Sequence, residues 1–448
     1  MTVQLNAIRE CLEGIIPGAV ATCAPGGTPN VTYLSQVQFV DNQHVALSYQ
    51  FFNKTRQNVL ANSRVRLMLV HPFTAARYRL SLQYLRTETE GPVFESMKAK
   101  LAGIASHTGM AGVFRLLGSD IYRVIEIESV PGESLPPPPP RDNLIAALRG
   151  ASERLSACAD FESLLQETLS SLEVQFDIHH TMLLMLDRAK ARLYTVASRG
   201  YEPSGVGSEI PLGQGVIGVA ARERTPIRIG HMTAEYGYGR AVRQSMQQQG
   251  LSAMLDTEIP LPGLSQSRSQ MAVPIVAAGH LLGVLYLESP EDLRFSYDDE
   301  DAMITLTRQL GMAIHILQNQ AETADQIVAE TSLPAPSGTP LAIRHYREDN
   351  SVFLNQDYLI KGVAGSIFWK LVRDYKEKNR TAFTNRELRL DPRIQLPDLS
   401  DNLEARLVLL HRRLLERQAC VRLEKTGRGR FRLLVNRPLE LVEERSRE

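Results

Sequence analysis

Residues 268–289 decide how the middle of this 448-residue chain folds. They read Arg268-Ser269-Gln270-Met271-Ala272-Val273-Pro274-Ile275 and, after Gly279, Leu281-Leu282-Gly283-Val284-Leu285-Tyr286-Leu287-Glu288-Ser289. Each half is a short apolar run, and the glycine between them favours a tight turn. The pattern therefore predicts two antiparallel strands joined as a hairpin.

The segments around this hairpin have helical and strand periodicity in turn. We predict helices at Leu144–Ala157 and Phe161–Phe176, strands at Thr181–Leu186 and Arg192–Val196, and a long final helix over Asp298–Ala329. Gly213 and Gly215 permit positive φ in a loop before a further short helix. Ser296 is a suitable N-cap for the final helix, with Asp298 and Asp299 favourable in its first turn.

Three motifs in this region resemble those of a GAF domain. They are Gly213-Gln214-Gly215, Thr225-Pro226-Ile227, and the Gly283–Ser289 strand with its Leu-x-Leu-Glu-Ser ending. The resemblance covers residues 142–318 and implies a central antiparallel sheet with helices on its back. It also implies a small-molecule site between the sheet and the loop at about 230–270, and flanking helices that pair in a homodimer. Packing of these helices on the chain's own sheet is the alternative to pairing.

That loop contains the candidate ligand-binding residues His231, Tyr236, Tyr238 and Arg240. Aromatic rings beside a guanidinium would stack on and neutralise a flat anion. A flexible surface loop without a ligand is the alternative. Relatives that attach a bilin use a cysteine here, and this chain has none between Cys158 and Cys420, so we expect no covalent bilin. The motif of the cyclic-nucleotide-binding relatives is also absent, and the identity of the ligand stays open.

Alternating apolar residues in the first segment predict a sheet. The predicted strands are Ala19–Cys23, Val31–Val40, His44–Tyr49, Val65–Val70, Arg77–Glu88 and Asp120–Ile127, with a helix at Lys54–Asn62. This order, and the stretch Asn53–Val65 above all, resembles the flavin-binding split β-barrel of the pyridoxamine-phosphate-oxidase superfamily, over residues 1–131. By that resemblance Lys54, Thr55 and Arg56 would bind the phosphate of FMN or a related flavin. Helix N-terminal amides and a guanidinium do favour a phosphate dianion.

Two alternatives to a bound flavin in the barrel stay open. A haem or another flat cofactor would use His71 and His107 as ligands, and the barrel could equally be an empty structural unit. No residue stands out as a base for a substrate, so we expect no oxidase activity and assign no catalytic residue.

Two proline-rich stretches divide the chain. Residues 136–140 are five consecutive prolines, which favour a stiff extended spacer. We place a linker at 132–141 on this basis. A second stretch between Ser332 and Pro340 ends a helical extension and linker at 319–340.

Residues 341–448 predict a third domain. Its expected elements are strands at Ala342–Arg347, Ser351–Leu354 and Tyr358–Ile360, helices at Ala364–Lys378, Asn385–Leu390 and Asp401–Arg417, and a hairpin over Val421–Val435. The helix around Leu403–Leu414 and the stretch Gly427-Arg428-Gly429-Arg430-Phe431-Arg432-Leu433 resemble the third helix and β-wing of the winged-helix effector domain of response regulators.

The resemblance implies binding to duplex DNA. Arg412, Arg413, Arg428 and Arg430 would contact phosphates, and Arg406, nearer the helix start, would contact a base. This region has 23 Lys and Arg against 16 Asp and Glu, so it carries a charge of +7 in a chain of net charge zero. Asp398, Asp401 and Glu404 depart from the pattern, because they would repel a DNA backbone. A winged helix that binds a protein is therefore the alternative.

Bulk properties bound the location of the protein. No run approaches the roughly 18–20 apolar residues of a membrane-spanning helix. The N-terminus lacks the pattern of a signal peptide, so we expect a cytoplasmic protein without a membrane partner. The four cysteines are scattered, with no histidine at metal-binding spacing, so we expect free thiols and no metal site.

The sequence thus predicts a multidomain α+β chain: a split β-barrel, then a GAF antiparallel sheet with helices, then a winged helix. The leading functional hypothesis is a one-component transcriptional regulator in which the barrel and the GAF domain control the winged helix, rather than an enzyme. The alternatives are a signalling scaffold that binds a protein through the winged helix, and a flavin-dependent oxidoreductase with accessory domains.

Overall fold

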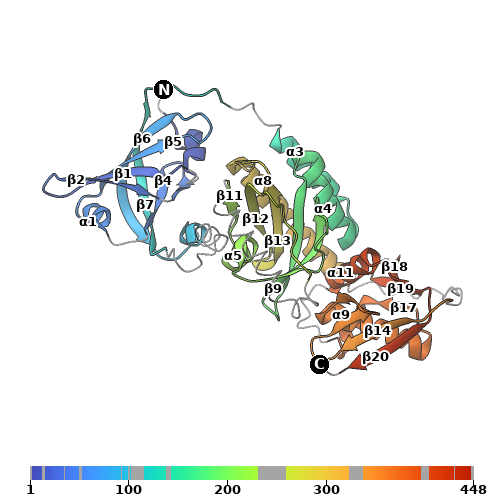
Figure 1. Ribbon diagram of the computed structural model, residues 1–448. Coiled ribbons are helices and arrows are strands. Elements are labelled where there is room, and N and C mark those ends of the chain that lie inside the picture. The colour runs from blue at the N-terminus through green and yellow to red at the C-terminus, as the bar shows by residue number, and fades with distance from the viewer. Residues whose placement is uncertain are drawn as a thin grey trace.

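The computed structural model describes residues 3–444, apart from 13–15, 35, 50–52, 92, 99–100, 102–115, 138–142, 231–258, 322–336, 395–402 and 428. Three domains follow one another in space as they do along the chain (Figure 1). The N-terminal domain (residues 3–130) is blue, the central domain (143–321) is green to yellow, and the C-terminal domain (337–444) is orange to red. Each combines strands with helices, which confirms a multidomain α+β chain.

The N-terminal domain is a barrel-like sheet of seven strands in the order β2-β1-β5-β6-β7-β4-β3. Its elements are η1 (Leu5–Leu12), β1 (Gly18–Cys23), β2 (Pro29–Leu34), β3 (Val37–Asp41), β4 (His44–Tyr49), α1 (Lys54–Ala61), β5 (Arg64–Val70), β6 (Arg77–Glu88) and β7 (Gly118–Val130). The sheet encloses a core that includes Val45, Leu67 and Leu80, all fully buried. The short helix η1 packs against β3 and β5 and adds Leu5 and Ile8 to this core.

One predicted strand in this domain is wrong. The run Val31–Val40 forms two strands, β2 and β3, rather than one. The two lie at opposite ends of the strand order, because β2 pairs with β1 and β3 pairs with β4. The alternating pattern continues through both, so periodicity alone does not reveal that the chain changes its pairing partner between Leu34 and Val37.

The central domain is a six-stranded antiparallel sheet in the order β10-β9-β8-β13-β12-β11. Its elements are α3 (Leu144–Ser156), α4 (Phe161–Phe176), β8 (His180–Asp187), β9 (Arg192–Arg199), β10 (Glu209–Pro211), α5 (Gly215–Glu223), β11 (Ile227–Ile229), β12 (Ser269–Ala277), β13 (His280–Ser289) and α8 (Tyr297–Ala321). The helices α3, α4 and α8 cover one face of the sheet, and α5 packs on the other face.

The hairpin predicted from residues 268–289 is confirmed as β12 and β13. Ala277 pairs with His280, so only Ala278 and Gly279 form the turn, and both have positive φ. Such two-residue turns match the twist of the strands that they join. The predicted N-cap is also confirmed, because the Ser296 hydroxyl accepts a hydrogen bond from the Asp299 amide at 3.2 Å.

The C-terminal domain has two small sheets around three helices. Its elements are β14 (Leu341–Tyr346), β15 (Ser351–Leu354), β16 (Asp357–Ile360), α9 (Gly362–Lys378), β17 (Ala382–Thr384), α10 (Asn385–Leu390), α11 (Leu403–Glu416), β18 (Val421–Gly427), β19 (Arg430–Val435) and β20 (Leu439–Glu444). The sheets have the orders β16-β15-β14-β20 and β17-β19-β18. The three predicted strands, three helices and hairpin are present. The edge strand β20, which pairs in parallel with β14, is an addition that the sequence analysis missed.

The central and C-terminal domains share one hydrophobic core. A single cluster of buried side chains includes Leu164 of α4, Leu285 of β13, and Leu409 and Leu410 of α11. The helix α11 contacts α4 and β9 of the central domain as well as α9 of its own domain. The two domains are therefore docked through an apolar interface, and α11 lies in it.

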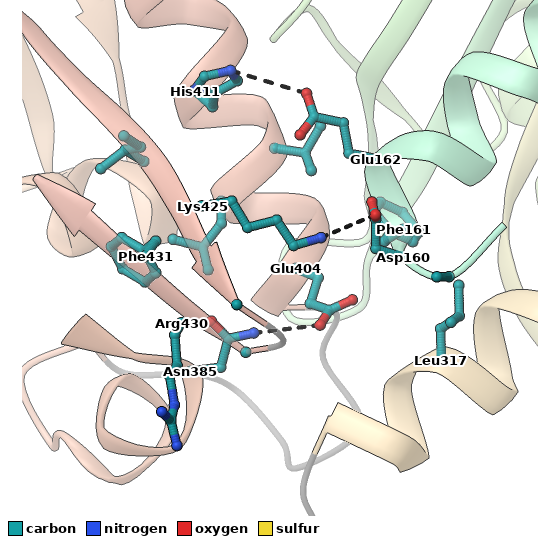
Figure 2. Close-up of a pocket in the computed structure, with 16 residues that line it drawn as sticks. Asp160, Phe161, Glu162, Leu317, Asn385, Glu404, His411, Lys425, Arg430 and Phe431 are labelled. Atoms are coloured by element: carbon teal, nitrogen blue, oxygen red, sulfur yellow. Dashed lines mark hydrogen bonds and ion pairs between the residues drawn. The ribbon is translucent and has the colours of Figure 1, made fainter. Parts of the chain in front are cut away.

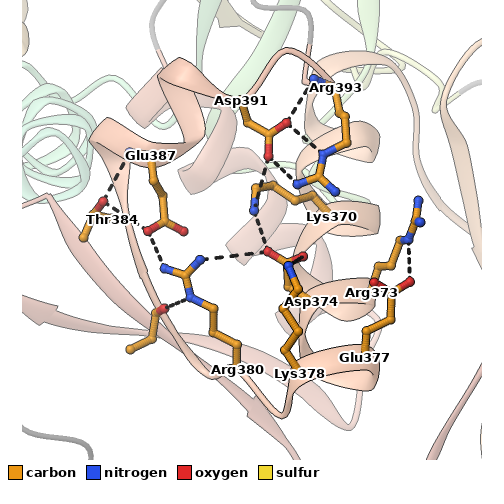
Figure 3. Close-up of polar contacts among 11 residues, drawn as sticks. Lys370, Arg373, Asp374, Glu377, Lys378, Arg380, Thr384, Glu387, Asp391 and Arg393 are labelled. Carbon is orange, nitrogen blue, oxygen red and sulfur yellow. Dashed lines mark hydrogen bonds and ion pairs between the residues drawn. The ribbon is translucent and has the colours of Figure 1, made fainter.

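A buried ion network holds the helices of the C-terminal domain together (Figure 3). The Lys370 ammonium lies 2.6 Å from Asp374 and 3.4 Å from Asp391. Hydrogen bonds from Arg393 hold the pKa of Asp391 far below its usual range. Burial opposes ionisation of Asp374, but the hydrogen bond from Lys370 outweighs it and the pKa of Asp374 is lowered too. Both carboxylates are therefore charged at neutral pH, Asp391 chiefly through Arg393 and Asp374 chiefly through Lys370.

We predict that Lys370→Met lowers the free energy of unfolding of the C-terminal domain by about 3 kcal/mol, because it leaves the buried carboxylate of Asp374 without its nearest cation. Trp369, the one tryptophan of the chain, lies in α9 and reports this unfolding by its fluorescence in a urea titration. The control is Arg373→Met, which removes an exposed pair with Glu377 and should cost about 0.5 kcal/mol. Equal losses for the two variants would contradict the role given to Lys370.

Candidate functional site

The first candidate site is a cavity of about 190 Å³ in the N-terminal domain, beside the start of α1. Its polar lining comes from four elements: Thr32 of β2, Ser48 of β4, the start of α1 with Asn53, Thr55 and Arg56, and Asp120 of β7. Asn53 begins the helix as its N-cap, because its side chain accepts a hydrogen bond from the Arg56 amide at 3.1 Å. The helix that begins at this cap places Thr55 and Arg56 at the cavity wall.

The structure brings two of the three predicted phosphate-binding residues into this cavity. Thr55 and Arg56 line it, whereas Lys54 is exposed and does not. The Thr55 hydroxyl accepts a hydrogen bond from the Asn30 amide nitrogen at 2.8 Å. The cavity therefore holds a hydroxyl and a guanidinium at the helix start.

The guanidinium of Arg56 is already paired with a carboxylate. One of its nitrogens lies 2.5 Å from Asp120, the other donates to the Thr87 hydroxyl at 2.6 Å, and the Tyr49 ring lies 4.5 Å away. Asp120 is buried, and the Arg56 side chain is 11% exposed. The sequence analysis missed Asp120, because nothing near Arg56 in sequence marks its partner 64 positions away.

This pairing decides how well the cavity suits a flavin phosphate. Burial raises the pKa of Asp120, although Thr87 and Arg56 oppose the rise. A phosphate at the start of α1 would meet the Thr55 hydroxyl, but it would also meet a carboxylate that competes for Arg56. The residues that line the cavity therefore suit the uncharged, hydroxyl-bearing part of a flavin better than its phosphate.

The histidines considered as haem ligands give no support for a metal in the barrel. The ring of His71 accepts hydrogen bonds from the amides of Phe73 and Thr74, at 3.2 and 3.3 Å, and its other nitrogen lies 3.3 Å from Glu10. It thus stabilises the turn after β5. His107 lies outside the described residues. Among the residues that the structure describes, no group of three or more His, Cys, Asp or Glu side chains is placed to hold a metal.

The second candidate site is a row of polar side chains across the central sheet. Gln270 of β12 pairs with Glu288 of β13, which pairs in turn with His180 of β8. Side chains alternate along a strand, so Glu288 shares the face of Tyr286, which packs in the cluster around α5. The row therefore lies on the face opposite to α3, α4 and α8.

Glu288 is the centre of this row. It is buried, and its carboxylate accepts hydrogen bonds from the Tyr201 hydroxyl and the Leu264 amide, both at 3.1 Å, and from the Gln270 amide at 3.3 Å. Burial lowers the pKa of His180 despite the nearby Glu288. Sequence reasoning quoted Glu288 in a motif but gave it no role. The signal was a carboxylate at the end of an otherwise apolar strand, since a buried charge needs a reason.

The four predicted ligand residues, His231, Tyr236, Tyr238 and Arg240, lie outside the described residues. The chain enters their segment at Gly230, directly after β11, and Ile229 of β11 pairs with Gln270. By connectivity, the predicted ligand loop thus starts at the end of the sheet where the polar row lies.

The third candidate is α11 with the hairpin that follows it, which carry the predicted DNA-binding residues. Arg406 lies 2.8 Å from Asp187, at the end of β8, and its guanidinium carbon is 3.9 Å from the centre of the Tyr194 ring. Arg412 donates to the Val196 carbonyl at 3.1 Å, and Arg413 donates to the Leu359 carbonyl at 3.1 Å. Burial lowers the pKa of both Arg412 and Arg413. These three cations therefore face protein rather than solvent.

The hairpin differs from the helix in exposure. Arg430 begins β19 and is half-buried, and Arg428 lies outside the described residues. Figure 2 shows Lys425 of β18 reaching across to Asp160, at the start of α4, over a distance of 3.1 Å. Phe161, Leu317 and Phe431 line the cavity between these elements, and Asn385 donates to Glu404 at 3.3 Å. Glu404, one of the acidic residues that depart from a DNA-binding pattern, thus contacts its own domain.

Two known families match parts of this chain. The family model of the GAF domain matches residues 158–315. The model of pyridoxamine 5'-phosphate oxidase matches residues 5–116. The two matches bear out the GAF and flavin-type barrel resemblances, and neither extends into the C-terminal domain. They support a small-molecule sensing or signalling protein as the general class.

Solved structures resemble single domains of the chain. The GAF domain of an Acinetobacter phosphoenolpyruvate-protein phosphotransferase is 18% identical, with a TM-score of 0.31, and the match covers 42% of this chain and all of that one. An FMN-binding protein from Syntrophomonas wolfei is 15% identical, with a TM-score of 0.25, over 29% of this chain and 86% of that one. HupZ from Group A Streptococcus is 20% identical, with a TM-score of 0.24, over 30% and 98%.

The comparison with curated proteins found no match. In the part of the chain that the structure describes, no helix is long and apolar enough to cross a membrane.

We predict that Arg56→Met destabilises the N-terminal domain by about 3 kcal/mol at pH 7, because Asp120 stays buried without its cation. The loss should shrink as the pH falls. The folded-state pKa of Asp120, already raised, rises further in the variant, so the folded state binds a proton that the unfolded state, with a pKa near about 3.9, does not.

Calorimetric unfolding at pH 7 and at about pH 5 measures this difference. Arg86→Met is the control, because its pair with Glu88 is more exposed and its loss should have little effect at either pH. A loss for Arg56→Met that does not change with pH would contradict the assignment of Asp120 as the uncompensated group.

Proposed function

We propose that this protein is a ligand-responsive regulator whose C-terminal domain binds duplex DNA as a winged helix. The observation that carries the proposal is the order and chemistry of the output elements. Three helices precede the hairpin β18–β19, and the turn of that hairpin has the sequence Gly427-Arg428-Gly429-Arg430. Glycines let a hairpin approach a groove closely, and arginines neutralise phosphates.

The ligand would bind in the central domain, on the face that carries Gln270, Glu288 and His180. A buried carboxylate and amide with fixed hydrogen-bond partners can select a ligand by its donors and acceptors. The chain enters the segment with His231, Tyr236, Tyr238 and Arg240 at the end of β11, whose Ile229 pairs with Gln270, and we propose that this segment supplies aromatic and cationic contacts. We further propose a homodimer, supported by the exposed apolar side chains Met312 and Ile316 on α8.

One observation favours the alternative of a signalling scaffold. The helix α11 already packs against another domain of its own chain, because Arg406 and Arg412 contact the central domain. A helix suited to such contacts could present the same face to another protein. The two functions differ in their response to salt, since only phosphate contacts release condensed counterions.

We predict that the full-length chain binds duplex DNA of mixed sequence, with an affinity that falls steeply with salt. Arg430→Gln should weaken binding to all sequences and flatten the slope of log K against log salt by about one unit. Arg344→Gln is the matched control, because Arg344 is an exposed cation on β14, in the other sheet of the domain. Fluorescence anisotropy at several salt concentrations gives both quantities. Absence of binding below about 100 µM at low salt would favour the scaffold.

The barrel is a second proposed ligand site, for a flavin. We predict that Asp120→Asn raises the preference for FMN over riboflavin about tenfold, because it frees Arg56 for the phosphate. Absorbance titrations of the wild-type chain and the variant with each flavin measure the preference. An unchanged ratio would show that the phosphate does not contact Arg56, and a protein that binds neither flavin would remove the proposal.

A further inference from the structure

The helix α11 docks on the central domain through a buried ion pair. Arg406 and Asp187 lie 2.8 Å apart, and their side chains are 5% and 7% exposed. The Tyr194 ring covers the guanidinium at 3.9 Å. A side chain that points into another domain in this way cannot at the same time contact a base of DNA.

Weaker polar contacts between the two domains surround this pair, among them a 4.0 Å contact of His411 with Glu162. Arg412 donates to the Val196 carbonyl on β9 at 3.1 Å. Lys425 pairs with Asp160 at 3.1 Å, with both side chains partly exposed. The Ser204 hydroxyl donates to Glu416, at the end of α11. These partners in the central domain lie on β8, on β9, in the loop that follows β9, or at the start of α4, so one surface receives the helix.

A buried ion pair of this kind determines the docking position of α11 more than it stabilises the interface. The free-energy cost of removing two charges from water offsets most of their mutual attraction. A buried ion pair therefore adds little net stability compared with the same two groups separated and hydrated. A wrong docking position, however, would leave a buried charge unpaired, which costs much more. The ion pair therefore fixes the geometry of the interface, and its two charged groups separate readily once water reaches them.

From this geometry we propose that the Arg406–Asp187 pair is an autoinhibitory latch, which holds α11 against the central sheet and away from DNA. The proposal rests on the proposed function in one respect, namely that α11 contacts DNA when released. The strand β8 connects the latch to the ligand face, since it begins at His180 in the polar row and ends at Asp187. A ligand that changes the position of β8 would thereby change the hold on Arg406.

The latch is tested by variants of the central domain, so that every candidate DNA contact stays intact. Asp187→Asn removes the charge that holds Arg406, while its remaining oxygen can still accept the hydrogen bond from the Lys190 amide. Asp160→Asn is the milder variant, because it removes the pair with Lys425 and can keep the cap on Ser163. Asp292→Asn is the matched control. It removes an equal charge from an exposed pair with Arg268.

Two measurements on the full-length chain follow each variant: hydrogen exchange of the α11 amides, and affinity for duplex DNA. For Asp187→Asn we expect exchange and affinity each to rise about tenfold. Asp160→Asn should raise both by a smaller factor, and Asp292→Asn should raise neither. Higher affinity in Asp292→Asn as well would trace the gain to net charge and overturn the latch.

The outcomes separate the latch from the proposed function. Faster exchange of α11 in Asp187→Asn, with no DNA binding by any variant, supports the docking role of the pair and overturns DNA binding as the output. DNA binding by the wild-type chain with the same affinity as Asp187→Asn overturns the latch and leaves the proposed function standing. Unchanged exchange in both interface variants also overturns the latch.

Discussion

The arrangement of the central and C-terminal domains depends on the packing of α11 against β9. Apolar side chains of α4, β13 and α11 fill one continuous core, so the two domains pack directly against each other at this surface. Within that apolar contact the ion pair of Arg406 and Asp187 sets the register. The same helix carries most of the cations that the sequence assigns to DNA, so the state of this interface determines whether those cations are available.

The polar row of the central sheet and the cavity of the barrel differ in how they are built. The row is placed by strand register alone, because Gln270, Glu288 and His180 are direct neighbours across three strands. The barrel cavity depends on one long-range pair, Arg56 with Asp120, which brings a helix start against the seventh strand. A ligand bound at the polar row would therefore contact the sheet against which α11 packs. A ligand bound in the barrel would lie in the N-terminal domain, farther from α11 (Figure 1).

The sequence predicted the elements that local patterns specify. The hairpin of β12 and β13 followed from two apolar runs around Gly279, and the start of α8 followed from Ser296. The split between β2 and β3 was missed because the alternation runs through both strands. The edge strand β20 was missed because a sequence with as many acidic as apolar residues, Leu439–Glu444, has no burial pattern of its own until β14 pairs with it.

Site residues were harder to predict, since their partners are distant in sequence. Thr55 and Arg56 were found from a helix start, but Asp120, which changes what Arg56 can bind, has no local signal. Arg406 was selected for its place on α11, and nothing near it in sequence indicates that Asp187 and Tyr194 cover it. Pattern and propensity thus identify which side chains carry chemistry, and only tertiary packing shows which are already occupied.

The most direct measurement is the distance between α11 and the central domain with and without DNA. Spin labels at two exposed positions, Leu415 of α11 and Val174 of α4, would report it by double electron–electron resonance. The account predicts a single short distance for the free chain and a longer one when duplex DNA is bound. A distance that stays short in the DNA-bound chain would contradict it.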